Sequence, residues 1–122
     1  MKFVAAAPSE QPTGPYGPLV AMPELVPDAL RAAVAKIAPS RVPALTQHVF
    51  EATSNAQRTS SLAPLRAFVH SWAVFVAIER IPERAARLRE LERVVNEGLH
   101  DPTAAIAEIQ AIREAAEAEA GL

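Results

Sequence analysis

The chain of 122 residues contains no cysteine, and this absence excludes two kinds of site. Disulfide bonds cannot form, and no thiolate is available to hold zinc. A protein without disulfides suits a reducing compartment, so we expect a cytoplasmic location. The fold must then rely on a hydrophobic core, and a chain of this length is long enough to bury one.

Glycine is scarce as well, with four residues isolated at positions 14, 17, 98 and 121. That distribution excludes the glycine-rich loops that hold phosphates and the G-x-S-x-G turn of serine hydrolases. The three histidines, His48, His70 and His100, are not spaced to place two metal ligands on one helical face. We therefore expect a protein that is not an enzyme and binds no metal or cofactor. The alternative is an enzyme in which the fold unites His48, His70 and Glu79.

Long apolar runs and an excess of one charge are also missing. No stretch approaches the roughly 20 apolar residues of a membrane-spanning helix. The apolar run near Met1 has about five residues, fewer than the 7 to 15 of a signal peptide. A net charge of −2 gives no overall attraction to nucleic acid or anionic lipid. We expect no membrane association and no signal peptide.

The densest apolar stretch runs from Leu62 to Pro82 and contains the only tryptophan, Trp72. Its large apolar residues recur at steps of three and four, which favours a helix over a buried strand. We expect Ser61 to be the N-cap and Pro82 to end the helix. This helix is predicted to be the centre of the core, with Glu79 half-buried beside an arginine.

Proline is concentrated near the N-terminus, where residues 1–27 hold six of the eleven prolines. We interpret residues 1–26 as an extended arm and residues 27–120 as a helical domain. Pro12, Pro15 and Pro18 are three residues apart, which is the period of a polyproline II helix, and this predicts a segment that binds across a protein surface. Its candidate contact residues are Pro12, Pro15, Tyr16, Pro18 and Leu19. The other interpretation is an unanchored tail.

Four further helices are predicted from proline, glycine and apolar spacing. The first follows Asp28 as N-cap and ends before Ala38. The second is capped by Ser40 and turns Leu45, Val49 and Phe50 inward. The remaining two cover about residues 82–97, with a stripe that continues to Leu99, and about residues 102–118, with Asp101 as N-cap.

The last predicted helix has a narrow apolar stripe that includes Ile109 and Ile112. Such a stripe suits packing on the same chain or on another chain, so both residues are candidate protein-binding positions. Its acidic C-terminal end opposes the helix dipole and is expected to fray unless a partner binds it. A separate stripe of Arg80, Arg84 and Arg87 offers the alternative of a nucleic-acid-binding regulator.

Several short motifs resemble a family of small, uncharacterised actinobacterial helical proteins. The resemblance covers about residues 45–95 and rests on Phe50-Glu51, Ser61-Leu62-Ala63-Pro64-Leu65, Trp72, Pro82-Glu83 and Arg87-Leu88. Members are similar to partners in toxin–antitoxin-like gene pairs, which implies a regulatory, protein-binding role. The resemblance implies no catalytic residues.

Together these observations predict an all-α protein, a bundle of four to five helices with an extended proline-rich arm. The predicted function is a non-catalytic interaction or regulatory module, of which an antitoxin-like protein is one form. Its expected partner is another protein or a second copy of the chain.

Overall fold

A computed structural model describes residues 17–122, and the fold in this range is all-α, as predicted. The five α-helices are α1 (Pro27–Ile37), α2 (Val42–Thr59), α3 (Ala63–Glu79), α4 (Pro82–Glu97) and α5 (Thr103–Ala120), and a 3₁₀ turn, η2 (Pro39–Arg41), precedes α2. The described range contains no β-strand. None of its helices combines the length and the apolar character needed to cross a membrane.

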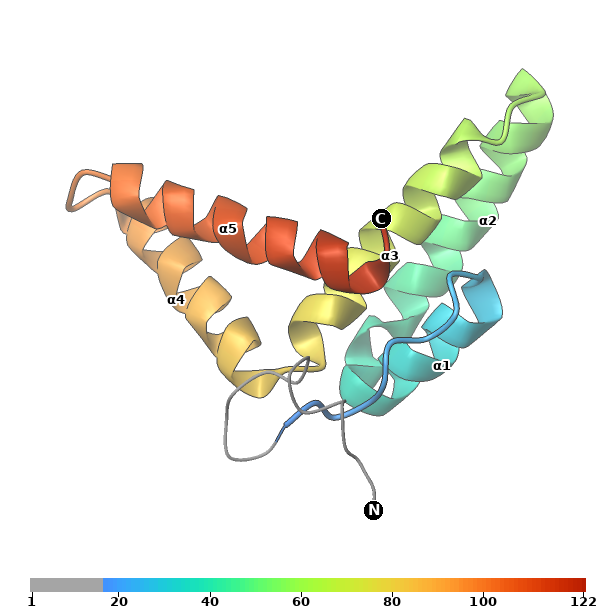
Figure 1. Cartoon of the computed structure of the whole chain (residues 1–122). Coiled ribbons are helices and arrows are strands. Elements are labelled where there is room, and N and C mark those ends of the chain that lie inside the picture. Colours follow the sequence, from blue (N-terminus) through green and yellow to red (C-terminus); the bar gives the residue numbers. More distant parts are fainter. Residues whose placement is uncertain (1–16) are drawn as a thin grey trace, which may run out of the picture.

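Two helical hairpins meet at the C-terminal half of α3. The α2–α3 hairpin and the α4–α5 hairpin diverge from this point, and α1 packs beside α2 and α3 (Figure 1). Helix α3 is in contact with all four other helices. The prediction that the Trp72 helix is central is therefore confirmed.

The core consists of two clusters on different faces of α3. The first includes Leu30, Leu45, Phe68 and Trp72, and it joins α1, α2 and α3. The second joins α3, α4 and α5 through Val74, Ala77, Ile78, Ala85, Leu88 and Ala116. Because α3 is covered on both faces, its C-terminal half can be apolar almost all round.

The N-caps were predicted wrongly, because proline decides where most of these helices begin. Pro27 is the first residue of α1, so Val26 is the N-cap and Asp28 lies in the first turn. Ser40 lies in the 3₁₀ turn rather than capping α2. Proline has no N–H to be capped, and its fixed φ suits the first helical turn.

One serine and one aspartate accept hydrogen bonds from the first turn of a helix without occupying the N-cap position. The N-cap of α3 is Leu62, although Ser61 Oγ accepts a hydrogen bond from the Ala63 N–H at 3.1 Å. The N-cap of α5 is Pro102, and Asp101 Oδ1 accepts a bond from the Thr103 N–H at 3.0 Å. In both cases the N-cap is one residue later than predicted, and the serine or aspartate lies immediately before it.

Two apolar residues predicted to face the core are exposed. Phe50 is 68% exposed because the buried stripe of α2 follows Leu45, Ala52 and Ala56, which places Phe50 on another side of the helix. Leu99 is 73% exposed because Gly98 ends α4 in the left-handed conformation, with φ of 67°. The predicted stop at Gly98 is confirmed, and it breaks the stripe before Leu99.

Candidate functional site

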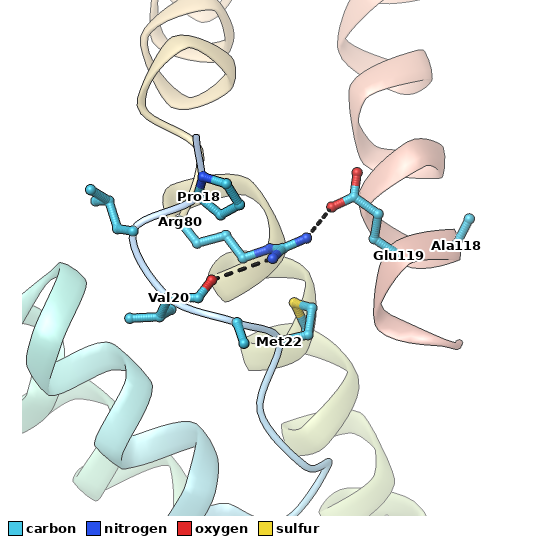
Figure 2. A pocket seen from close by; sticks show the side chains of 8 residues that line it. Pro18, Val20, Met22, Arg80, Ala118 and Glu119 are labelled. Carbon is cyan, nitrogen blue, oxygen red and sulfur yellow. Dashed lines mark hydrogen bonds and ion pairs between the residues drawn. The ribbon is translucent and has the colours of Figure 1, made fainter. Parts of the chain in front are cut away.

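Arg80, at the C-terminal end of α3, joins three parts of the chain (Figure 2). Its carbonyl accepts a hydrogen bond from the Leu19 N–H at 2.7 Å, and its Nη1 donates to the Val20 carbonyl at 3.3 Å. Its Nη2 donates to Glu119 of α5 at 2.7 Å. The segment before α1 is therefore held against α3 and α5 by one mostly buried arginine.

Glu119 is shared by two arginines, because Arg84 of α4 also donates to it. Burial raises the pKa of Glu119, but the hydrogen bonds from Arg84 and Arg80 outweigh that effect and lower its pKa below the ordinary value. A groove of about 820 Å³ runs beside this junction, lined by Pro18, Leu19, Val20, Ala21, Met22, Arg80, Ala118 and Glu119. Five of its eight lining residues, Pro18 to Met22, belong to the N-terminal segment.

The predicted arm is only partly within the described residues. Pro12, Pro15 and Tyr16 lie outside them, so their predicted role in protein binding is unaffected. Pro18 is half-buried, whereas the side chain of Leu19 is exposed while its backbone is held by Arg80. Further along, Val20, Met22 and Leu25 pack against the first core cluster. The chain from residue 17 onward therefore belongs to the packed domain.

The three arginines predicted to form a basic stripe are paired with carboxylates. Arg80 and Arg84 bind Glu119, and Arg87 binds Glu108 of α5 at 2.7 Å through Nε and Nη2. The Arg87 hydrogen bond lowers the pKa of Glu108. With its charges neutralised in this way, the stripe offers little to phosphate, and the nucleic-acid alternative gains no support. These arginines connect α5 to its neighbours.

The last helix packs on its own core. Ala116 is completely buried, and Ile109 and Ile112 are half-buried against the second cluster. Of the two alternatives for this helix, packing on the same chain is the one observed, and the role of Ile109 and Ile112 in binding a protein partner stays a prediction. The acidic end of α5 is also satisfied within the chain, since Glu117 lies 3.2 Å from His70 and Glu119 binds arginines. Consistent with this, α5 continues to Ala120 rather than ending near residue 118.

The groups of the alternative enzyme have separate partners. His48 Nδ1 accepts a hydrogen bond from Trp72 Nε1 at 2.9 Å, whereas His70 lies beside Glu117. Glu79 is half-buried and pairs with Arg89 at 3.1 Å, as expected for a carboxylate beside an arginine. Within residues 17–122 there is no group of three His, Cys, Asp or Glu side chains placed to hold a metal ion.

A second surface feature, which the sequence did not reveal, is an apolar groove between α3 and the two ends of the described chain. We call it the leucine groove: it has a volume of about 360 Å³ and is lined by Leu25, Leu62, Leu65, Arg66, Val69, His70 and Leu122. Leu62 is 59% exposed and Leu122 is 46% exposed. An adjoining hollow of about 330 Å³ shares Leu62 and Leu65 and extends over the end of α2.

No protein-family model, curated protein or solved structure matches this chain. The resemblance over residues 45–95 therefore stays a prediction, and the site must be interpreted from its own chemistry.

That chemistry differs between the two grooves. The Arg80 groove is built around charges that already satisfy one another, so its clearest role is to hold the N-terminal segment. The leucine groove exposes apolar side chains to water, and covering them with an apolar partner surface would be favourable. It has one cation on its rim, Arg66, with no ion-pair partner among the residues that the structure describes. The leucine groove is therefore the better candidate for binding.

Proposed function

We propose that the protein is a non-catalytic interaction module that binds a partner protein through the leucine groove. The observation that carries this proposal is the exposure of Leu62 and Leu122 in one hollow. Contiguous exposed apolar side chains with a polar edge are typical of protein-binding surfaces. Arg80, Arg84 and Arg87 at the hairpin junction are paired with carboxylates of α5, whereas the apolar side chains of this groove are exposed to water.

The shape and charge of the groove favour one kind of partner. Leu62, Leu65 and Val69 are spaced by three and four along the start of α3, so they present a stripe against which an amphipathic helix can pack. Arg66 projects from the same segment and lacks a carboxylate partner within residues 17–122. The expected ligand is a helix with an apolar stripe flanked by at least one aspartate or glutamate.

An antitoxin-like, regulatory role in the cytoplasm is the more specific form of this proposal. It is favoured by the resemblance over residues 45–95 and by the lack of cysteine. In that role the leucine groove would cover an amphipathic helix of the protein being regulated.

The proposal is tested by replacing Leu62 with aspartate and comparing the result with Phe50→Asp. Phe50 is equally apolar and exposed, but it lies on α2 and does not line the groove. Tagged wild-type protein is used to capture partners from the native host, and a captured protein is then purified for titration calorimetry. We expect Leu62→Asp to raise Kd at least tenfold, which corresponds to about 1.4 kcal/mol, and Phe50→Asp to leave Kd within about twofold of the wild-type value.

Light scattering at two protein concentrations distinguishes a second copy from a foreign partner. A wild-type dimer that Leu62→Asp converts to a monomer would place another copy of this chain in the groove. Equal Kd values for the Leu62→Asp and Phe50→Asp variants, with both still folded by circular dichroism, would contradict the proposal.

A further inference from the structure

A small cavity lies beside Trp72, on a part of the surface that shares no residue with the leucine groove. It has a volume of about 170 Å³ and is lined by Arg41, His48, Ser71, Trp72 and Phe75. A larger cleft of about 400 Å³ adjoins it, since Arg41, Ser71 and Phe75 line both. The two hollows together have the size of a small-molecule site.

The histidine of this cavity is fixed in one tautomer. Trp72 Nε1 can only donate a hydrogen bond, and it does so to His48 Nδ1 at 2.9 Å. His48 Nδ1 must then be the unprotonated nitrogen, so the ring proton resides on Nε2. His48 is thereby made a hydrogen-bond donor through Nε2, which has no partner among the described residues.

Arg41 contributes a second donor group. Its guanidinium carbon lies 4.9 Å from the centre of the Phe75 ring and 5.6 Å from that of Trp72. Stacking uses the face of the guanidinium and leaves its N–H edge available. No carboxylate of residues 17–122 pairs with Arg41, unlike Arg80, Arg84 and Arg87.

Ser71 adds a hydroxyl group, which makes no hydrogen bond to any other group in the described chain. The small cavity therefore combines three donors, from Arg41, His48 and Ser71, with no carboxylate in its wall. An aromatic floor with a few converging polar groups is the usual composition of a ligand site. Donors alone select a ligand that supplies negative charge and acceptor oxygens.

The larger cleft indicates what the rest of the ligand is like. Its floor is apolar, formed by Val74, Ile78 and Leu88, with Phe75 at the junction with the small cavity. Its rim carries Glu79 and Glu92, each beside an arginine, at 3.1 Å from Arg89 and 3.7 Å from Arg113. Because these two arginines are already paired with carboxylates, a second negative charge on the ligand would find no free cation on this rim, which favours a ligand with a single negative charge.

We propose that this cavity binds a small monocarboxylate with an apolar, preferably aromatic, body. The carboxylate accepts hydrogen bonds from Arg41, His48 and Ser71, and the body lies on Phe75 and the apolar floor of the larger cleft. This binding is independent of the leucine groove, so either proposal can fail without the other.

The test uses 4-phenylbutyrate as the probe and the fluorescence of Trp72, the only tryptophan in the chain, as the signal. We expect a saturable change with a Kd of about 1 mM, the range for a ligand of this size. Amide shifts in a ¹H–¹⁵N spectrum should be largest around Arg41 and Ser71. The neutral 4-phenylbutyramide, which lacks the charge, should bind at least tenfold more weakly.

Variants separate the donors from the general effect of charge. Arg41→Gln should raise the Kd for phenylbutyrate at least tenfold, whereas Arg31→Gln on the exposed side of α1 should leave it unchanged. If Arg41→Gln disturbs the packing of Trp72, Ser71→Ala keeps the rings in place and should raise Kd about threefold. Equal binding of acid and amide, no saturable response, or variant Kd values equal to the wild type would each overturn the proposal.

Discussion

Replacing Trp72 with alanine should remove a large part of the free energy that holds α2 against α3. The side chain is only 5% exposed and packs edge-on against Phe75, with ring centres 5.2 Å apart. A buried tryptophan removes about 200 Å² from water, which corresponds to about 5 kcal/mol at about 25 cal/mol per Å². Alanine retains a small part of this contact but leaves a cavity.

We therefore expect the Trp72→Ala variant to lose about 3 to 5 kcal/mol of unfolding free energy. The total for a domain of this size is about 5 to 15 kcal/mol, so the loss is between a fifth and the whole of the stability. Urea titration followed by circular dichroism at 222 nm measures the change, because the variant has no tryptophan fluorescence. The midpoint should fall by about 2 to 3.3 M if the slope is about 1.5 kcal/mol per M.

Trp72→Phe is the matched control, since it keeps an aromatic ring and loses the N–H that His48 accepts. It should cost less than the alanine variant, about 1 to 2 kcal/mol, from the lost hydrogen bond and the smaller ring. A cost below about 1 kcal/mol for Trp72→Ala would refute the reasoning. It would mean that α3 is held by its second, α4–α5 face and that the first cluster contributes little.

Three further changes test other parts of the fold. The pKa of Glu119 is lowered in the folded state, so the stabilising effect of this carboxylate is present above the unfolded pKa of about 4.3 and is lost as the pH falls through the folded pKa. The Glu119→Gln variant should therefore lose less stability than the wild type between pH 5 and pH 3. Identical urea midpoints for the variant and the wild type at both pH values would contradict this. Ala116→Leu should cost about 1 to 3 kcal/mol in urea titration, because Ala116 is fully buried and a larger side chain must displace its neighbours; a neutral result would show that α5 is free to shift. Gly98→Ala should lower the free energy of unfolding by about 1 kcal/mol through backbone strain alone, because φ of Gly98 is 67° and no atom lies within 4 Å of the new Cβ. An unchanged melting temperature would show that the loop relaxes without cost.

Much of the fold could be predicted because this sequence marks its helix boundaries strongly. Pro27, Pro64 and Pro82 each lie at a helix start, and Gly98 lies at a helix end. The apolar run around Trp72 was correctly assigned to a central helix. These signals are local, in that each acts on the residues within a turn or two of itself.

The errors at Phe50 and at the arginine stripe came from features that depend on residues far apart in the sequence. Phe50 has the composition of a core residue, and only the packing of α2 on α1 and α3 shows that it faces solvent. The carboxylates that neutralise Arg80 and Arg87 are contributed by α5, so the arginine spacing gave no sign of them.

The leucine groove could not be predicted for the same reason. Leu25, Leu62 and Leu122 come from three separate parts of the chain, and each is unremarkable where it stands in the sequence. The cavity beside Trp72 likewise depends on Arg41 reaching across from the turn before α2. A single sequence shows which side chains exist, whereas the tertiary contacts decide which of them meet.

The junction at Arg80 also has a consequence for the order in which the protein folds during synthesis. Val20 precedes Arg80 by 60 residues, and Glu119 follows it by 39. The ribosome therefore releases the N-terminal segment and α3 long before the carboxylate that neutralises Arg80. Until α5 emerges, Arg80 and Arg84 form an uncompensated pair of positive charges beside the exposed apolar face of α3. Because α5 supplies Glu119 and covers the second face of α3, the junction can close only after this last helix has been synthesised.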